Sequence, residues 1–277
     1  PRPVDTHHLT DALGRGEMGD AEVLAAMYRG LIVFDHTEAA WYLWAGHYWA
    51  KDRVGLIWQT LAKLGARYYM AAAELFDLDK KDDASGKLAK RAAELGNRRR
   101  GENVLHLAAR HTDLALVGDE WDRDPWLLGV ENGVVDLRTG QLRPGHPQDR
   151  IRSIAPGQWQ GLEAPAPRWE RFLGEVFAGD PELVAFAGRL LGYGLTGLTN
   201  EHRLPILWGA GRNGKTTLLE VLGDVLGQDL ATATQAEALM DLGRNTGGPQ
   251  PHIYALRGKR LVWAAETNED RALKPGM

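Results

Sequence analysis

The chain has 277 residues, of which 44% are hydrophobic and 25% are charged, and its formal net charge is −4. This composition is typical of a globular protein, and it excludes attraction to nucleic acid through the overall charge. The chain has no cysteine, which excludes disulfides and thiolate zinc sites. No apolar run reaches the roughly 18 residues of a membrane span, so we expect a cytoplasmic protein with no membrane partner.

Residues 1–103 are expected to form a mainly helical region that contains one aromatic hairpin. In residues 41–52, aromatic side chains flank Ala45-Gly46, which predicts two strands joined by a tight turn. Residues 54–96 return to helical patterns. The aromatic side chains of the hairpin could stack on bases, but we favour a role in the core.

A basic run ends this helical region. Residues 87–100 read KLAKRAAELGNRRR and contain one acid, Glu94. The run could contact DNA phosphates. Alternatively, it is a solvated helix face with cations near the negative carboxyl end of the helix. We favour this second interpretation. The candidate DNA-binding residues are Lys87, Lys90, Arg91, Arg98, Arg99 and Arg100.

Residues 104–162 are expected to be rich in short strands. Their apolar segments alternate and break at Asn132-Gly133 and at Thr139-Gly140, which is typical of hairpins.

Residues 163–200 are expected to form a linker and a helical lead-in. The proline-rich stretch at 163–169 is typical of a linker. Asp180 predicts the start of a helix, because its capping oxygen is followed by a proline and an acid. We expect this helix to run to Gly197.

Residues 201–277 contain a glycine loop, GAGRNGKTT at 209–217, with the spacing G-x-x-x-x-G-K-T of a phosphate-binding (Walker A) loop. The apolar residues 203–208 predict a buried strand before the loop, and the following residues predict a helix that Gly227 ends. Glycines let backbone N–H groups approach phosphate oxygens. The alternative is a chance match in a glycine-rich turn. The candidate nucleotide-binding residues are Gly209, Ala210, Gly211, Arg212, Asn213, Gly214, Lys215, Thr216 and Thr217.

The side chains after the glycines suggest roles in ATP chemistry. Lys215 can reach the β- and γ-phosphates, and the Thr216 hydroxyl can ligate Mg²⁺. A second apolar run at 261–265 ends at Glu266, whose carboxylate can hold Mg²⁺ or polarise water, as in a Walker B strand. Glu269 is the next acid, and which carboxylate takes which role is open. The alternative is a solvated acidic loop.

The glycine loop and the segment LRGKRLVWAAETNEDRAL resemble the ATPase of superfamily 3 helicases. The resemblance is to the branch in phage and plasmid primase–helicases and the related poxvirus protein. Residues 132–151, 167–183 and 190–217 are similar to elements that precede this ATPase, and residues 41–52 are similar more loosely. The resemblance implies an α+β N-terminal region followed by the first part of an α/β P-loop ATPase domain of the AAA+-like, superfamily 3 type.

The resemblance also implies a function. It implies an ATP-dependent DNA helicase of phage or plasmid replication in a bacterial cytoplasm, which uses ATP and Mg²⁺. It implies a homo-oligomeric ring, a hexamer, which translocates on single-stranded DNA at a replication fork beside a primase module in the same or a partner chain. The chain ends at Met277, after the Walker B strand and before the DNA-contacting hairpin and arginine finger of the family. We therefore expect weak or no ATP hydrolysis by this segment alone.

Two other functions stay open. One is a P-loop NTPase without helicase activity, because a fold and a loop do not fix the function. The other is a non-catalytic module for DNA docking or oligomerisation.

Overall fold

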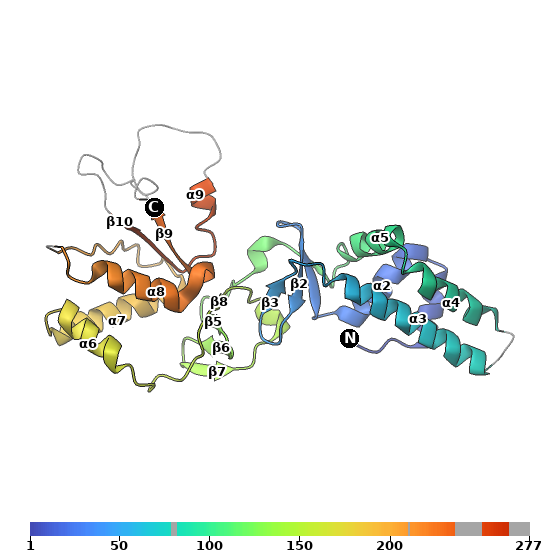
Figure 1. Cartoon of the computed structure of the whole chain (residues 1–277), viewed down its shortest axis with the longest axis horizontal. Coiled ribbons are helices and arrows are strands. Elements are labelled where there is room, and N and C mark those ends of the chain that lie inside the picture. The colour runs from blue at the N-terminus through green and yellow to red at the C-terminus, as the bar shows by residue number, and fades with distance from the viewer. Residues whose placement is uncertain (79–81, 210, 236–250, 266–277) are drawn as a thin grey trace. The chain divides into compact units, whose positions relative to one another are not determined.

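The computed structural model describes residues 1–78, 82–209, 211–235 and 251–265 (Figure 1). Its contacts divide the chain into two compact units. The first unit comprises residues 1–123 and 146–150, and the second comprises residues 124–145 and 151–277. Each unit combines helices with small sheets, so the chain is a mixed α and β protein.

Helices make up most of the first unit. Three of them begin after a side chain that accepts a backbone N–H of the first turn: Asp5 before α1, Asp82 before α4 and Asn97 before α5. Such caps satisfy N–H groups that have no partner within the helix. Leu24, Leu64 and other fully buried side chains then form a common core. The helices are α1 (Thr6–Leu13), α2 (Gly16–Tyr28), α3 (Trp58–Leu78), α4 (Asp83–Glu94) and α5 (Arg98–Ala108).

The first unit also contains a four-stranded sheet in the order β3-β2-β1-β4. Its strands are β1 (Ile32–Asp35), β2 (Ala40–Trp44), β3 (Trp49–Lys51) and β4 (Ala115–Leu116). β2 and β3 form the predicted hairpin, in which Trp44 pairs with Trp49. Tyr42 and Trp49 are buried with Trp121, so these aromatic side chains belong to the core. Trp49 Nε1 donates to the carbonyl of Pro147 at 3.0 Å, which anchors residues 146–150 in this unit.

The second unit contains a four-stranded sheet in the order β7-β6-β5-β8. Its strands are β5 (Leu127–Val130), β6 (Gly133–Asp136), β7 (Gln141–Arg143) and β8 (Ile154–Ala155). The predicted hairpins are confirmed, because β5 pairs with β6 and β6 pairs with β7, both antiparallel.

Three longer helices and a pair of strands complete the second unit, together with the short helix α9 (Pro251–Tyr254). The predicted helix after Asp180 is confirmed, because Asp180 accepts the N–H groups of Glu182 and Leu183 and Gly197 ends the helix with φ 69°. Leu226 and Leu230 of α8 join the core beside Leu128 of β5. The elements are α6 (Pro167–Val176), α7 (Pro181–Thr196), α8 (Lys215–Leu230), β9 (Ala231–Gln235) and β10 (Leu261–Ala265).

Some local expectations were wrong. β1 interrupts the expected helical start of the chain, because it pairs with strands on both sides, in β2 and β4. Arg98–Arg100 begin α5 rather than end the preceding helix, because Asn97 caps them, and α5 continues to Ala108, where strands were expected. The linker expected at 163–169 is shorter, because α6 begins at Pro167 and leaves only residues 163–166 outside a helix.

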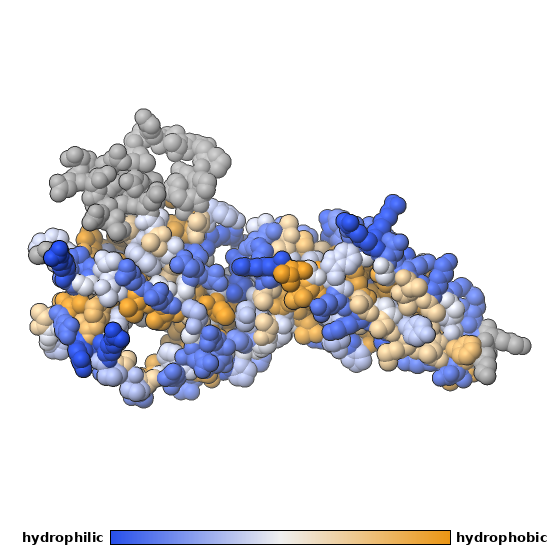
Figure 2. Space-filling view, in the orientation of Figure 1, coloured by the Kyte–Doolittle hydropathy of each residue, from blue (hydrophilic) through white to orange (hydrophobic). Residues whose placement is uncertain are grey.

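Apolar surface is visible over the α6–α8 part of the second unit (Figure 2), where Leu183, Phe186 and Val225 are exposed. A parallel sheet normally has both faces covered, and the paired strands β9 and β10 form a sheet of only two described strands. Among the described helices, none combines the length and the apolar character needed to cross a membrane.

Candidate nucleotide-binding loop

The glycine loop has the backbone of a tight turn that leads into α8. Gly211 and Gly214 have φ of 86° and 84°, a region that other residues rarely adopt. Helix α8 begins at Lys215, directly after Gly214. The N–H groups of its first turn have no partner within the helix, so this end can bind an anion.

Two glycines of the loop have close neighbours. A Cβ atom on Gly214 would lie 2.6 Å from Cγ2 of Val176, at the end of α6. A Cβ atom on Gly209 would lie 1.9 Å from Nδ2 of Asn213. The loop is therefore closed against itself and against α6.

The ammonium group of Lys215 folds back over the loop. Its Nζ donates to Oδ1 of Asn213 at 2.7 Å and to the carbonyl of Gly209 at 3.3 Å. Thr216, Thr217 and Arg212 are exposed. Gly209 and Gly214 lie close to Lys215. The N–H of Gly211 donates to the carbonyl of Gly209 at 2.9 Å, and Ala210 lies outside the described residues.

The segment before the loop does not form the predicted strand. Residues 203–208 have no regular secondary structure, and Trp208 is 90% exposed. β10 pairs in parallel with β9, and no described strand pairs with residues 203–208. The expectation of a buried strand was wrong here, because an extended segment needs a partner for its backbone groups.

The second apolar run does form a strand. β10 covers the predicted residues 261–265. The two acids expected after it, Glu266 and Glu269, lie outside the described residues. In the described part of the chain, no three His, Asp or Glu side chains gather as a metal site. Thr216 is the expected magnesium ligand that the structure describes, and it lies in the first turn of α8.

Arg260 holds the start of β10 through hydrogen bonds that the sequence did not predict. The guanidinium of Arg260, which precedes β10, donates to the carbonyls of Leu195 and Leu127 at 2.5 Å each and to that of Pro125 at 3.4 Å. Leu195 lies in the last turn of α7, where a cation is favourable. A basic residue before a strand gives no sequence signal of this role.

The six basic candidates divide into two groups. Four of them have exposed side chains: Lys87, Lys90, Arg98 and Arg99. Lys87 and Arg98 form ion pairs with acids one turn away on their own helices. Such exposed pairs are weak, so these side chains can exchange their partners for phosphates.

The other two cations serve the core of the first unit. Arg91 Nη1 lies 2.8 Å from Oδ1 of Asp20, and Arg100 Nη2 lies 2.7 Å from Oδ2 of Asp20. The side chain of Asp20 is completely buried, whereas those of Arg91 and Arg100 are only 11% and 18% exposed. The Tyr68 hydroxyl also donates to Asp20, at 2.8 Å. A buried carboxylate needs such partners, so Arg91 and Arg100 have a structural role.

Comparisons find similarity to a known family and to a viral protein, each over half of this chain or more. A family model described as "D5 N terminal like" matches residues 21–178. A protein of Acanthamoeba polyphaga mimivirus with the name "Putative helicase L207/L206" is 28% identical over 141 residues. The match covers 50% of this chain and 15% of the mimivirus protein, so the chain corresponds to a small part of that protein.

Proposed function

Since the chain belongs to the D5 N-terminal-like family, we propose that it is a segment of an ATP-dependent DNA helicase or primase–helicase. In this proposal the glycine loop binds Mg·ATP. The mimivirus relative carries a helicase name, which supports the function at the level of the family. The resemblance to superfamily 3 helicases supports the remaining details: a ring, a hexamer, that translocates on single-stranded DNA beside a primase module.

The position of Lys215 is the observation that carries the proposal. Its ammonium lies over a loop with two positive-φ glycines, where its acceptors among the described residues are a carbonyl and an amide oxygen. Phosphate oxygens carry more charge than these acceptors, and charge-assisted hydrogen bonds are stronger. We propose that ATP phosphates replace Asn213 and Gly209 as the acceptors of Lys215.

The roles of the other residues follow from the same arrangement. The backbone N–H groups from Gly209 to Thr217 would surround the phosphates. The Thr216 hydroxyl would ligate Mg²⁺, and Glu266, with Glu269, would serve the metal and the attacking water. Mg²⁺ would neutralise charge on the β- and γ-phosphates.

The first test is Mg·ATP binding, measured by calorimetry on this chain and on Lys215→Ala. Removing the ammonium is expected to weaken ATP binding about 10²-fold, as when a charged partner of a buried anion is lost. Lys51→Ala is the matched control, since Lys51 forms an exposed ion pair with Glu38 in the first unit. Equal ATP affinity in the unchanged chain and in Lys215→Ala would refute the proposed loop function.

The second test separates a DNA motor from other NTPases. ATP hydrolysis by the full-length protein is measured with and without single-stranded DNA, followed by strand displacement. DNA-stimulated hydrolysis that Lys215→Ala abolishes, together with strand separation, is the expected result. Stimulation without strand separation would instead indicate an NTPase that is not a helicase.

We also propose that the exposed cations of α4 and α5 contact DNA. Replacing Arg98 and Arg99 with glutamate is expected to weaken single-stranded DNA binding by the full-length protein and to reduce its salt dependence. Arg100 is left unchanged, because it is one of the two cations that pair with the buried carboxylate of Asp20. Unchanged DNA affinity would assign these side chains to a solvated surface.

A further inference from the structure

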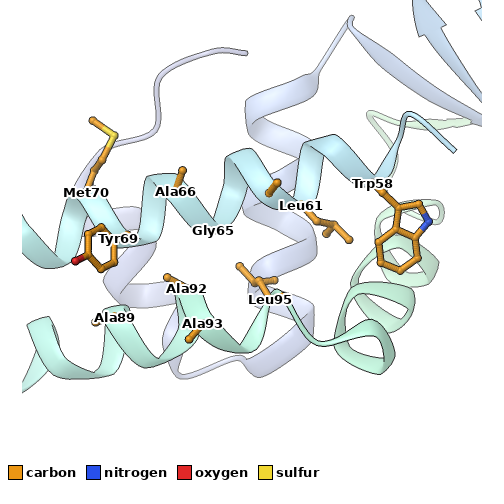
Figure 3. A pocket seen from close by; sticks show the side chains of 12 residues that line it. Trp58, Leu61, Gly65, Ala66, Tyr69, Met70, Ala89, Ala92, Ala93 and Leu95 are labelled. Carbon is orange, nitrogen blue, oxygen red and sulfur yellow. The ribbon is translucent and has the colours of Figure 1, made fainter.

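A groove with an apolar lining lies between α3 and α4 (Figure 3) and has a volume of about 640 Å³. Small residues form its floor, among them Gly65, Ala66, Ala92 and Ala93. The two helices approach closely at Gly65, where a Cβ atom would lie 3.3 Å from the carbonyl of Ala92. The small floor leaves room for another chain to approach the backbones of both helices.

Larger apolar side chains stand at the two ends of the groove. Trp58 lies at the end near α5, and Tyr69 and Met70 lie toward the other end (Figure 3). Tyr69 is 65% and Met70 is 58% exposed, so both side chains are accessible to a partner. Eleven residues separate Trp58 from Tyr69, a length of about 16 Å along a helix. The groove can therefore hold about three turns of a partner helix.

One lysine borders each side of the groove, and one acid, Glu94, lies between the lining residues Ala93 and Leu95. Lys63 follows the lining residue Ala62, and Lys90 follows the lining residue Ala89. Both lysines are exposed. Within the described residues Lys63 forms no ion pair, and Lys90 lies 4.0 Å from its acidic neighbour Glu94. Lys63 is therefore available to an acidic partner, and Lys90 can exchange its long, exposed ion pair with Glu94 for one.

We propose that this groove binds an amphipathic helix of another protein, with an apolar stripe that fills the groove and acidic residues along both edges. Binding of a helix in a groove between two helices is a common mode of recognition. Charge disfavours a second copy of this chain as the occupant, because two identical grooves would bring Lys63 and Lys90 close to the same lysines. The proposal does not depend on ATP binding.

The test uses a designed helical peptide of about 18 residues, with leucines on one face and glutamates along both edges. A second peptide has lysine in place of each glutamate. Each is titrated into the 277-residue chain, and binding is followed by fluorescence anisotropy at low salt. We expect the glutamate peptide to bind about tenfold more tightly than the lysine peptide, because it matches the charge of the borders.

Two double variants, one control and one reserve variant locate the binding. Ala66→Gln with Ala93→Gln fills the floor without adding charge and is expected to weaken the glutamate peptide about tenfold. Lys63→Gln with Lys90→Gln is expected to weaken it about fivefold. Lys87→Gln is the matched control, because Lys87 is exposed on α4 but does not adjoin a lining residue. If Ala66→Gln with Ala93→Gln loses its circular dichroism signal, Met70→Gln replaces it, because Met70 is an exposed residue of the lining.

Several outcomes would overturn the proposal. They are no binding of the glutamate peptide at about 1 mM, equal affinity for the two peptides, or equal weakening by Lys87→Gln and by the double lysine variant. Sedimentation of the chain alone provides a further check. A dimer that dissociates on Ala66→Gln with Ala93→Gln would show that a second copy fills the groove.

Discussion

At the scale of single residues, two buried tyrosines of the first unit differ in their hydrogen bonds. The Tyr68 hydroxyl donates to Asp20 at 2.8 Å. The Tyr28 hydroxyl has no hydrogen-bond partner among the described residues. Burial raises the pKa of both hydroxyls, and the charge of Asp20 raises that of Tyr68 further. The two residues thus offer a matched test of buried hydrogen bonding.

We predict different effects on stability of removing the two hydroxyls. Tyr68→Phe is expected to lower the free energy of unfolding by about 1.5–3 kcal/mol, because a hydrogen bond to a charged group is lost. Tyr28→Phe is expected to be neutral or slightly stabilising, since it removes a buried polar group without a partner. Urea unfolding followed by circular dichroism measures both. A loss in Tyr28→Phe as large as in Tyr68→Phe would mean that Tyr28 has a partner, such as a buried water.

At the scale of elements, the start of α3 depends on Asp52. Its carboxylate accepts backbone N–H groups from Gly55, Leu56 and Ile57, each at 2.8–2.9 Å. Burial acts to raise the pKa of Asp52, but these N–H donors outweigh it and hold the pKa below its usual range. The carboxylate therefore prepares the turn that leads into α3.

We predict a pH dependence from this turn. The folded pKa of Asp52 is lower than the unfolded value, so its stabilisation is complete above about pH 4 and is lost as the pH falls through the folded pKa. Asp52→Asn is expected to lower stability by about 0.5–2 kcal/mol at pH 7, because the amide NH2 that replaces Oδ2 cannot accept the N–H of Ile57, and to reduce the acid sensitivity. Thermal melts between pH 7 and pH 2 test this, with Asp83→Asn, at an exposed acid of α4, as the control. Parallel pH profiles for the unchanged chain and Asp52→Asn would contradict the assignment.

At the scale of the whole molecule, the two units have separate cores. The clusters around Leu64 and Trp49 lie in the first unit, and the cluster around Leu226 lies in the second. Because these clusters share no residue, we expect calorimetry to show two unfolding transitions.

Asp20→Asn should lower the transition temperature of the first unit, because Arg91 and Arg100 lose their buried counter-charge. Arg260→Met should lower that of the second.

We predict that Mg·ATP stabilises only one of these transitions. At a concentration of about 100 Kd, a ligand that binds the folded state adds about 2.7 kcal/mol, which raises the Tm by several degrees. The transition that rises should be the one that Arg260→Met lowers, and Lys215→Ala should abolish the rise. A shift of the transition that Asp20→Asn lowers would place nucleotide binding outside the proposed loop.

The sequence by itself determined the features that depend on a few neighbouring residues. Asp180 caps a helix, Gly197 ends it, and the aromatic hairpin turns near Gly46, because capping and turn conformations are local. The positive φ of Gly214 before Lys215 belongs to the same class. The division of the chain into four parts and the acid roles of Glu266 and Glu269 stay predictions.

Only the tertiary structure decided which groups meet across long separations. Arg91 and Arg100 belong to one basic run by sequence. The packing of α2 against α5 and the long side chain of Arg91 on α4 bring both guanidinium groups to Asp20. Likewise, residues 203–208 have the apolar pattern of a strand but no described partner, since a strand is stabilised by pairing and not by its own pattern. Local chemistry thus predicts caps, turns and loops, whereas buried charges and strand pairing depend on contacts between distant segments.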